Sequence, residues 1–159
     1  LVADAWPMTT EALPAPSLLP VLELRVRVSA PVDGELVSHG QRRETAIQGG
    51  ELVALAGATG LGLDGLSGVV LPGGADQQLV RPDGTIEIDA QYLVETRAGA
   101  LIAVRARGIR RPSPDGVYFR VALSFSSRAE EAAELTRSVF VADGVREADE
   151  VRHTVFLVG

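Results

Sequence analysis

The chain contains no cysteine and no lysine, because all 15 of its Lys and Arg residues are arginine. Without cysteine there is no disulfide, thiolate nucleophile, zinc ribbon or iron–sulfur cluster. Without lysine there is no Schiff base, no pyridoxal phosphate attachment and no Walker-type lysine. We attribute the missing lysine to codon bias in a high-GC genome, such as that of an actinobacterium. Thiol and amine chemistry are therefore excluded for this chain.

Long apolar runs and an excess of positive charge are also missing. No run approaches the ~20 apolar residues of a membrane-spanning helix. The first twenty residues have neither the basic region nor the continuous apolar core of a secretory signal. The net charge is −6 and the pI is near 4.9, which disfavours nucleic acid and anionic lipid as partners. We expect a cytoplasmic protein with no nucleic-acid or membrane partner.

The 159 residues match one domain preceded by a short arm. Residues 1–20 carry four of the nine prolines and no periodic pattern, so we interpret them as an extended arm before a single domain at 21–159. Because the chain begins at Leu1, either its start lies upstream or Met8 is the native start.

From Val21 onward, apolar and polar residues alternate, as in Leu22, Leu24, Val26 and Val28, which predicts half-buried antiparallel strands. Turn sequences rich in Pro, Asp and Gly separate the segments. The sequence therefore predicts an all-β fold, a small antiparallel β-barrel of about eight to ten strands with room for one small ligand. After the first strand, the predicted strands are Glu44–Gln48, Leu66–Leu71, Gln77–Arg81, Thr85–Arg97, Ala100–Arg107, Val117–Ser127, Arg137–Ala142 and Val151–Val158.

One short helix is predicted at Arg128–Leu135, capped by Ser127. A second segment, Gly60–Gly65, matches the G-x-G-x-x-G pattern of dinucleotide sites. Such a site needs a helix that opens at the glycines, whereas LSGVVLPGG follows here. We interpret the glycines as a connection between strands and expect no nucleotide cofactor.

The two histidines, His39 and His153, lie far apart in the sequence without paired ligand spacing, so we expect no metal site. His153 shares a strand face with Val151 and Val155, which favours a core position. His39 lies in a loop and is a candidate for lining the barrel mouth. No serine-hydrolase elbow is present.

The segment from Pro72 to Thr96 holds half of the candidate site residues. Asp76 follows a glycine-rich turn and Arg81 precedes a hairpin turn. In the next strand, alternation places Tyr92 on the apolar face and Asp89 on the polar face, and the sequence does not decide which face points inward. Surface carboxylates and a core tyrosine remain the alternative.

The strand from Val117 to Phe125 has a clear apolar face, with Tyr118 and Arg120 on the other face. A phenol beside a guanidinium is either a proton donor with a lowered pKa or a solvated stacked pair. The arginine cluster at 105, 107, 110 and 111 is either a solvated strand face or a source of one or two bidentate clamps for a ligand carboxylate.

Together these segments resemble a family of small bacterial and fungal proteins, domain of unknown function 3237, also called uncharacterised protein family 0311. The resemblance implies a compact antiparallel β-barrel that often self-associates, and it implies no general reaction. The residues that carry it are Gly40–Arg43, Ile47–Gly50, Leu71–Asp76, Leu79–Gly84, Asp89–Tyr92, Gly99–Gly108, Tyr118–Arg120 and Arg137–Gly144.

Departures from the family pattern accompany this resemblance. Gln77 stands where an aromatic residue is usual, and Ala98-Gly99 replaces a usual Asp-Gly. Glu134–Thr136 replaces a Trp-Leu-Asn-like run, and the stretch from Glu51 to Asp64 is longer than usual. These changes fit a member with a different substrate or a non-catalytic member.

We expect a cofactor-independent enzyme that performs acid–base chemistry, such as cyclisation, isomerisation or elimination, on a small, largely apolar molecule inside the barrel. Secondary metabolism in a bacterium is the expected setting. The alternatives are a lipocalin-like carrier without chemistry and an interaction module that forms a homodimer through its outer strand faces. The candidate acid–base residues are Asp76, Asp89, Tyr92 and Tyr118, and the candidate substrate-binding residues are Arg81, Arg120, His39 and Trp6.

Overall fold

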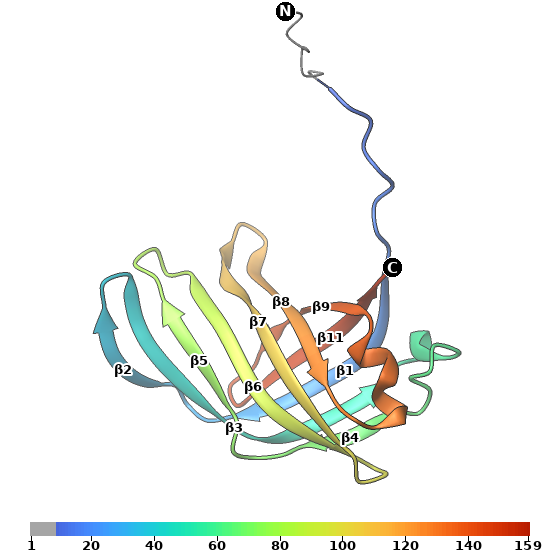
Figure 1. Cartoon of the computed structure of the whole chain (residues 1–159). Helices are drawn as coiled ribbons and strands as arrows, with labels where there is room; N and C mark the ends of the chain where they lie inside the picture. Colours follow the sequence, from blue (N-terminus) through green and yellow to red (C-terminus); the bar gives the residue numbers. More distant parts are fainter. Residues whose placement is uncertain (1–8) are drawn as a thin grey trace, which may run out of the picture.

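The computed structural model describes residues 9–159, which form eleven strands and two short 3-10 helices (Figure 1). The elements, in chain order, are β1 (Leu18–Val28), β2 (Val32–Val37), β3 (Gly40–Ala54), η1 (Ala56–Ala58), β4 (Ser67–Val70), β5 (Ala75–Val80), β6 (Ile86–Thr96), β7 (Leu101–Ser113), β8 (Gly116–Ser126), η2 (Glu130–Thr136), β9 (Val139–Asp143), β10 (Val145–Arg146) and β11 (Glu150–Val158).

The strands close into one antiparallel barrel with eight strand positions. The order around the ring is β1, β11, β9, β8, β7, β6, then β4 and β5 sharing a position, then β3, which pairs again with β1. The first half of the long strand β3 pairs with β2 and β5, and its second half pairs with β1 and β4. Closure leaves most strands without a free edge.

β3 changes partner strands near Gly50, and its backbone lies very close to the neighbouring strand there. A Cβ on Gly50 would collide with the carbonyl of Arg25 on the paired strand β1, and its φ of 143° is one that other residues rarely adopt. The adjacent Gly49 has a similar φ of 150°. These two glycines let β3 bend around the barrel without a break.

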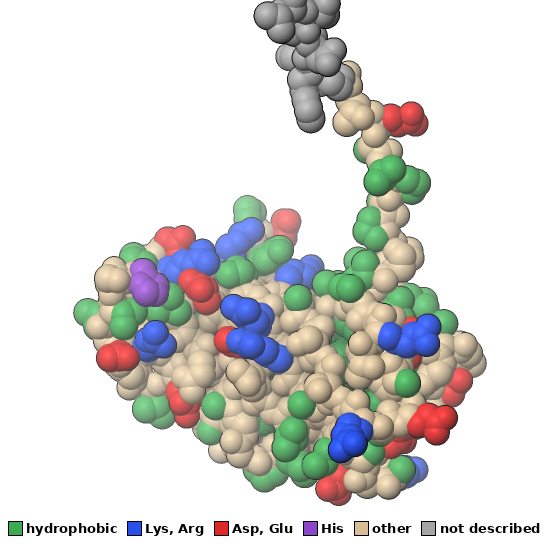
Figure 2. All heavy atoms as spheres, in the orientation of Figure 1, with side chains coloured by type: hydrophobic (Ala, Val, Ile, Leu, Met, Phe, Trp, Pro, Cys, Tyr) green, Lys and Arg blue, Asp and Glu red, His purple; other side chains and the backbone are tan. Residues whose placement is uncertain are grey.

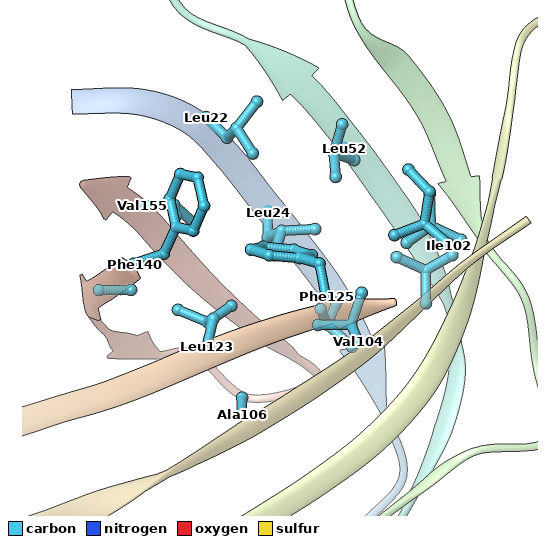
Figure 3. Close-up of a cluster of buried hydrophobic side chains, with 14 of the residues drawn as sticks. Leu22, Leu24, Leu52, Ile102, Val104, Ala106, Leu123, Phe125, Phe140 and Val155 are labelled. Atoms are coloured by element: carbon cyan, nitrogen blue, oxygen red, sulfur yellow. The ribbon is translucent and has the colours of Figure 1, made fainter. Parts of the chain in front are cut away.

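One half of the barrel interior is filled by apolar side chains (Figure 3). Phe125 and Phe140 meet edge to face, with ring centroids 5.3 Å apart, at the centre of this cluster. η2 contributes the buried residues Ala132 and Leu135, and in Figure 1 it lies at the end opposite the β2–β3, β5–β6 and β7–β8 hairpins. The interior is therefore a packed core at the η2 end. The cluster also includes Leu22, Leu24, Leu52, Ile102, Leu123 and Val155.

The all-β barrel expected from the alternating pattern is confirmed, and the structure decides which faces point inward. On β6, Ile88, Ala90, Tyr92 and Val94 are buried, so the apolar face lines the interior. Phe119, Val121, Leu123 and Phe125 of β8 are buried in the same way.

Some predicted elements were wrong in type or extent. The helix predicted at Arg128–Leu135 is a 3-10 helix at Glu130–Thr136, and Ser127 Oγ accepts a hydrogen bond from the Ala129 N–H before the helix begins. Strands β2 and β10 were not predicted. β2 is an exposed edge strand with no buried apolar face, and β10 has only two residues, so neither shows the alternation of a strand. The rest of β3 was missed because it is rich in Arg, Glu, Gln and Gly.

Residues 9–17, before β1, are extended and exposed, and the arm leaves the barrel next to the C-terminus (Figure 1). Ser17 and Gly159 exchange two backbone hydrogen bonds at this point. Within residues 9–159, no helix has the length and apolar character needed to cross a membrane.

Candidate functional site

The half of the barrel on the hairpin side contains a narrow cavity of about 30 Å³. It adjoins an open depression of about 580 Å³ at the barrel mouth, and Arg110 and Arg146 line both. Charged side chains of both signs cover the surface around these hairpins (Figure 2). The inner cavity is lined by aliphatic side chains together with Asp76, Gln78, Tyr92, Arg110, Phe119, Arg146 and His153.

Small residues at inward positions leave this space open. Ala90 and Ala106 are directly paired on β6 and β7, and both line the cavity. Gly74, which precedes β5 and is not part of this lining, lies so close to Tyr92 that a Cβ on Gly74 would stand 2.8 Å from Tyr92 Cβ. The alternation that fills the other half of the barrel with Leu and Phe here supplies alanine on both strands.

Asp76 is the buried carboxylate of this cavity, and the residue is 8% exposed. The Gln78 side-chain amide donates to its Oδ2 at 2.6 Å, and the backbone N–H of Asp89 donates to its Oδ1 at 3.1 Å. Burial raises the pKa of Asp76 above its ordinary value, while these hydrogen bonds and the nearby Arg110 guanidinium oppose the rise. Asp76 is thus a fixed carboxylate with a strengthened affinity for a proton.

Three half-buried arginines surround this carboxylate from β3, β7 and β10: Arg43, Arg110 and Arg146. Arg43 donates from Nε to the Gln78 side-chain oxygen at 2.8 Å, so one hydrogen-bonded chain links Arg43 to Asp76. Among residues 9–159, no carboxylate lies within the 4.0 Å of an ion pair from any of the three guanidinium groups.

The pKa of Arg110 is lowered by burial first and then by the positive charges of Arg146 and Arg43, against the attraction of Asp76. The pKa of Arg146 is lowered by burial and by the positive charge of Arg43, against the attraction of Asp76 and Asp149. Arginine nevertheless stays protonated in proteins. The site therefore holds more positive charge than Asp76 neutralises, in a chain whose net charge is −6.

On the wall formed by β7, β8 and β11, Phe119 lies between two polar groups. The Arg110 guanidinium carbon is 5.8 Å from the Phe119 ring centroid, and the His153 ring meets Phe119 edge to face at 5.4 Å. His153 Nδ1 lies 2.7 Å from the carbonyl oxygen of Asp143, which fits a donated N–H and leaves Nε2 as an acceptor. Burial lowers the pKa of His153, so the neutral ring is favoured.

Two buried hydroxyl groups in the described residues have no hydrogen-bond partner: Tyr92 Oη and Thr45 Oγ1. Tyr92 lines the cavity, and Thr45 is paired with Asp76 on the neighbouring strand. Burial alone raises the pKa of Tyr92 far above its ordinary value, so the phenol keeps its proton.

Of the predicted site residues, the structure brings Asp76 and Tyr92 to this cavity and places Asp89 outside it. Asp89 lies on the outer face of β6, where Arg105 binds its carboxylate through two hydrogen bonds of 3.1 and 3.0 Å. This pairing holds the pKa of Asp89 below its ordinary value.

Tyr118, Arg120 and Arg81 also lie on the outer surface or at the rim. Tyr118 is stacked between Arg111 and Arg120, whose guanidinium carbons are 4.6 and 5.5 Å from the ring centroid, as in the solvated stacked pair. Arg81 forms an exposed ion pair of 2.8 Å with Glu87. His39 is exposed in the β2–β3 turn and does not line the cavity, and Trp6 lies outside the described residues.

Sequence reasoning missed four residues of the site: Arg43, Gln78, Arg146 and His153. Gln78 and Arg43 face each other across β3 and β5, and this partnership depends on a strand register that the sequence does not state. For Arg110 the sequence did carry a signal. Within the cluster of four arginines on β7, only Arg110 lies an even number of residues from the buried Ala106, so alternation puts its side chain on the inner face.

The other motifs singled out in the sequence are not part of the cavity. Gly60–Gly65 lies in the loop between η1 and β4, and a strand rather than a helix follows it. In residues 9–159, no three His, Asp or Glu side chains come together in a group that could hold a metal ion.

Residues 16–158 match the model of a protein family described as "Protein of unknown function (DUF3237)". The chain is 33% identical over 145 residues to UPF0311 protein blr7842 from Bradyrhizobium diazoefficiens, which covers 82% of this chain and 89% of that protein. A β-barrel-like protein from Acinetobacter baumannii superposes with a TM-score of 0.82 at 25% identity, over 94% of this chain and 100% of that one.

A crystal structure described as an enzyme from Penicillium herquei superposes with a TM-score of 0.73. It is 18% identical and covers 95% of this chain and 100% of that chain, so the likeness shows a shared fold alone.

Proposed function

The chain belongs to the DUF3237 family, and we propose that it is a cofactor-independent enzyme that performs acid–base chemistry on a small, largely apolar anion inside the barrel. One observation carries this proposal: the buried carboxylate of Asp76 shares an apolar cavity with guanidinium groups that no carboxylate of residues 9–159 pairs. A bound anion completes the charge balance of such a site.

The charges determine how the substrate is oriented. Arg110 and Arg146 line both the mouth and the inner cavity, so they hold the anionic group of the substrate at the entrance. A guanidinium binds a carboxylate through two parallel hydrogen bonds, which fixes direction as well as position. The remaining, apolar part of the substrate lies against the aliphatic walls and Phe119, and because the inner cavity has a volume of only about 30 Å³, these walls must move apart to enclose it.

Asp76 transfers the proton. Its raised pKa brings the carboxyl closer to neutral pH, where one group both accepts and donates a proton efficiently. The carboxylate removes a proton from one substrate atom, and the resulting carboxylic acid returns it to another atom of the substrate or to a leaving group. Isomerisation, cyclisation and elimination each balance in this way, without a change of oxidation state.

Sequence composition also favours this class of reaction. The chain has no thiol and no primary side-chain amine for covalent catalysis, which leaves carboxylate, phenol, imidazole and guanidinium groups. The structure from Penicillium herquei, described as an enzyme, has the same fold and supports catalysis as a use of this barrel. The second candidate function is a carrier that binds the same anion without chemistry, because the binding groups are the same.

Ligand-observed NMR with two isosteric probes tests the anion site. We expect para-isopropylbenzoate to bind and the neutral para-isopropylbenzamide to bind at least about tenfold more weakly. The substitution Arg110→Gln removes one guanidinium from the cavity and is expected to abolish the preference for the acid. Arg107→Gln is the matched control, because Arg107 lies on the same strand with its side chain on the outer face. Equal binding of acid and amide by the wild-type protein would refute the anion site.

A second experiment separates enzyme from carrier. The protein is incubated with a bacterial metabolite extract in D₂O, and the extract is compared before and after by chromatography and mass spectrometry. A proton-transfer enzyme produces isomerised, cyclised or deuterated compounds in amounts greater than one molecule per protein molecule. A carrier returns every bound compound unaltered, and that outcome would leave only the binding function.

A further inference from the structure

Tyr92 Oη is a buried hydrogen-bonding group that the proposed chemistry does not use. Its side chain lines the cavity, and its hydroxyl has no partner in residues 9–159. Unpartnered buried polar groups are rare because losing the hydrogen bond to water costs about 1–3 kcal/mol. A native site that tolerates such a cost usually gains the missing partner from a ligand or an ordered water.

The strand register places Tyr92 at the inner end of the site. Arg110 is paired with Ile86 at one end of β6, and Asp76 is paired with Ala90 further along that strand. Tyr92 is the next inward residue after Ala90, and beyond it Val94 belongs to the packed core. The backbone positions of Arg110, Asp76 and Tyr92 therefore follow one another from the mouth inward.

The Tyr92 hydroxyl acts as a donor in this position. Burial raises its pKa far above the ordinary value, which keeps the phenol protonated. No acceptor of residues 9–159 takes its hydrogen, so an acceptor on the ligand is the partner that fits. An oxygen atom provides such an acceptor without adding a charge to the apolar end of the cavity.

We propose that Tyr92 donates a hydrogen bond to an uncharged oxygen at the inner end of the substrate. This inference rests on the function proposed above. It defines the substrate class as a small, largely apolar molecule with an anionic group at one end and a carbonyl or ether oxygen at the other. Tyr92 is then the residue that selects for the oxygen, and Asp76 acts between the two anchored ends.

Isothermal titration with matched pairs of probes tests this assignment. Para-acetylbenzoate and para-isopropylbenzoate are similar in size, and the carbonyl oxygen of the first stands where the second has a methyl group and a hydrogen. The corresponding phenylpropanoates form a second, longer pair. In at least one pair, we expect the wild-type protein to bind the acetyl member about fivefold more tightly. The substitution Tyr92→Phe removes only the hydroxyl and is expected to make both members bind equally, with the affinity for the isopropyl member unchanged.

The substitution Thr45→Val is the control, because it removes the other unpartnered hydroxyl in an isosteric way. Thr45→Val is expected to keep the preference for the acetyl member, and loss of the preference only in Thr45→Val would overturn the assignment to Tyr92. If both acids bind equally to the wild-type protein while Arg110→Gln weakens both, the anion site stands and this inference fails. If no acid binds to the wild-type protein, the proposed function fails, and the inference fails with it.

Discussion

Asp76 and Asp89 are joined by a hydrogen bond and lie on opposite faces of the same barrel wall. The backbone N–H of Asp89 donates to Asp76 Oδ1 at 3.1 Å, while the Asp89 side chain points outward to Arg105. Both carboxylates are acid–base candidates by sequence. The structure gives only Asp76 a buried position in the cavity, so the pair provides a matched test of the proposed chemistry.

The first prediction is that Asp76→Asn abolishes turnover and Asp89→Asn does not. Loss of a general acid–base residue is expected to reduce the rate by about 10²–10⁴-fold, because the neutral amide cannot accept the proton. The Asp89 side chain points away from the cavity, and its hydrogen bond to Asp76 comes from the backbone N–H, which Asp89→Asn keeps, so this substitution is expected to leave the rate within about twofold. The measurement is the rate of product formation in D₂O by mass spectrometry. An Asp76→Asn variant with the wild-type rate would exclude Asp76 as the catalytic residue.

The second prediction concerns the dependence of stability on pH. Because burial raises the folded-state pKa of Asp76 above its ordinary value of 3.8, the folded protein favours the neutral carboxyl. The resulting stability is fully present below that ordinary value and is lost as the pH rises through the folded-state pKa. Asp76→Asn removes this loss, so its free energy of unfolding should improve relative to the wild-type protein between about pH 4 and pH 7.

Urea unfolding at several pH values measures this slope. The lost hydrogen bond from Gln78 adds an offset that does not vary with pH, so the slope is the relevant quantity. Asp89→Asn should show the opposite slope at lower pH, because Arg105 lowers the pKa of Asp89 and its stabilisation is present above the ordinary value of 3.8 and is lost as the pH falls through the folded-state pKa. Parallel curves for the wild-type protein and Asp76→Asn would contradict the raised pKa.

The barrel could be predicted from the sequence because each pattern that indicates a strand or a turn is contained within one short segment. Alternation along β1, β6 and β8 is visible within one strand, and the Pro, Asp and Gly turns between strands are contiguous. For the same reason, β2 escaped prediction: its side chains are exposed along its whole length, so no apolar period marks it.

The site depends on relationships between strands and was predicted only in part. Asp76 and Tyr92 were identified because each is marked within its own segment: Asp76 follows a glycine-rich turn, and Tyr92 places a hydroxyl group on an apolar strand face. The partnership of Arg43 with Gln78 arises from the register of β3 against β5, which no single segment encodes. The inward position of Arg146 depends on β10, a strand of two residues that pairs with β11. Tyr118 and Arg120 were correctly seen as neighbours, but alternation alone did not show that their face is the outer one.

The third prediction is that His153 makes the protein less stable in mild acid. Burial lowers its pKa below the ordinary value of 6.5, so the folded state favours the neutral ring. The stability that this provides is present above that ordinary value and is lost as the pH falls through the folded-state pKa. His153→Asn keeps a donor for the Asp143 carbonyl and should lose less stability between about pH 7.5 and pH 5.5 than the wild-type protein.

Urea unfolding at the two pH values again provides the measurement. His39→Asn is the control, because His39 is exposed in the β2–β3 turn, and this variant should follow the wild-type curve. The same loss of stability in His153→Asn and in the wild-type protein would mean that His153 is not the titrating group.

The fourth prediction is that Tyr92→Phe stabilises the protein in the absence of ligand. The substitution keeps the ring and removes a buried hydroxyl without a partner in residues 9–159, which should raise the free energy of unfolding by about 1 kcal/mol. Tyr118→Phe on the outer face is the control and should change it by less than about 0.5 kcal/mol. A destabilised Tyr92→Phe variant in thermal unfolding would indicate that an ordered water already satisfies the hydroxyl.

The fifth prediction concerns the close approach between Gly74 and Tyr92. A Cβ on Gly74 would lie 2.8 Å from Tyr92 Cβ and would also collide with the Gln91 carbonyl, so the backbone or Tyr92 must move in Gly74→Ala. We expect a loss of about 1–3 kcal/mol in the free energy of unfolding. Gly34→Ala in β2 is the control, since the nearest atom to its Cβ is 3.7 Å away and alanine suits a strand at least as well as glycine. Equal stability of the two variants would show that Gly74 has room for a methyl group. Because Tyr92 lines the cavity, its displacement in Gly74→Ala should also weaken the preference for para-acetylbenzoate, which links the packing of the wall to the selection of the ligand.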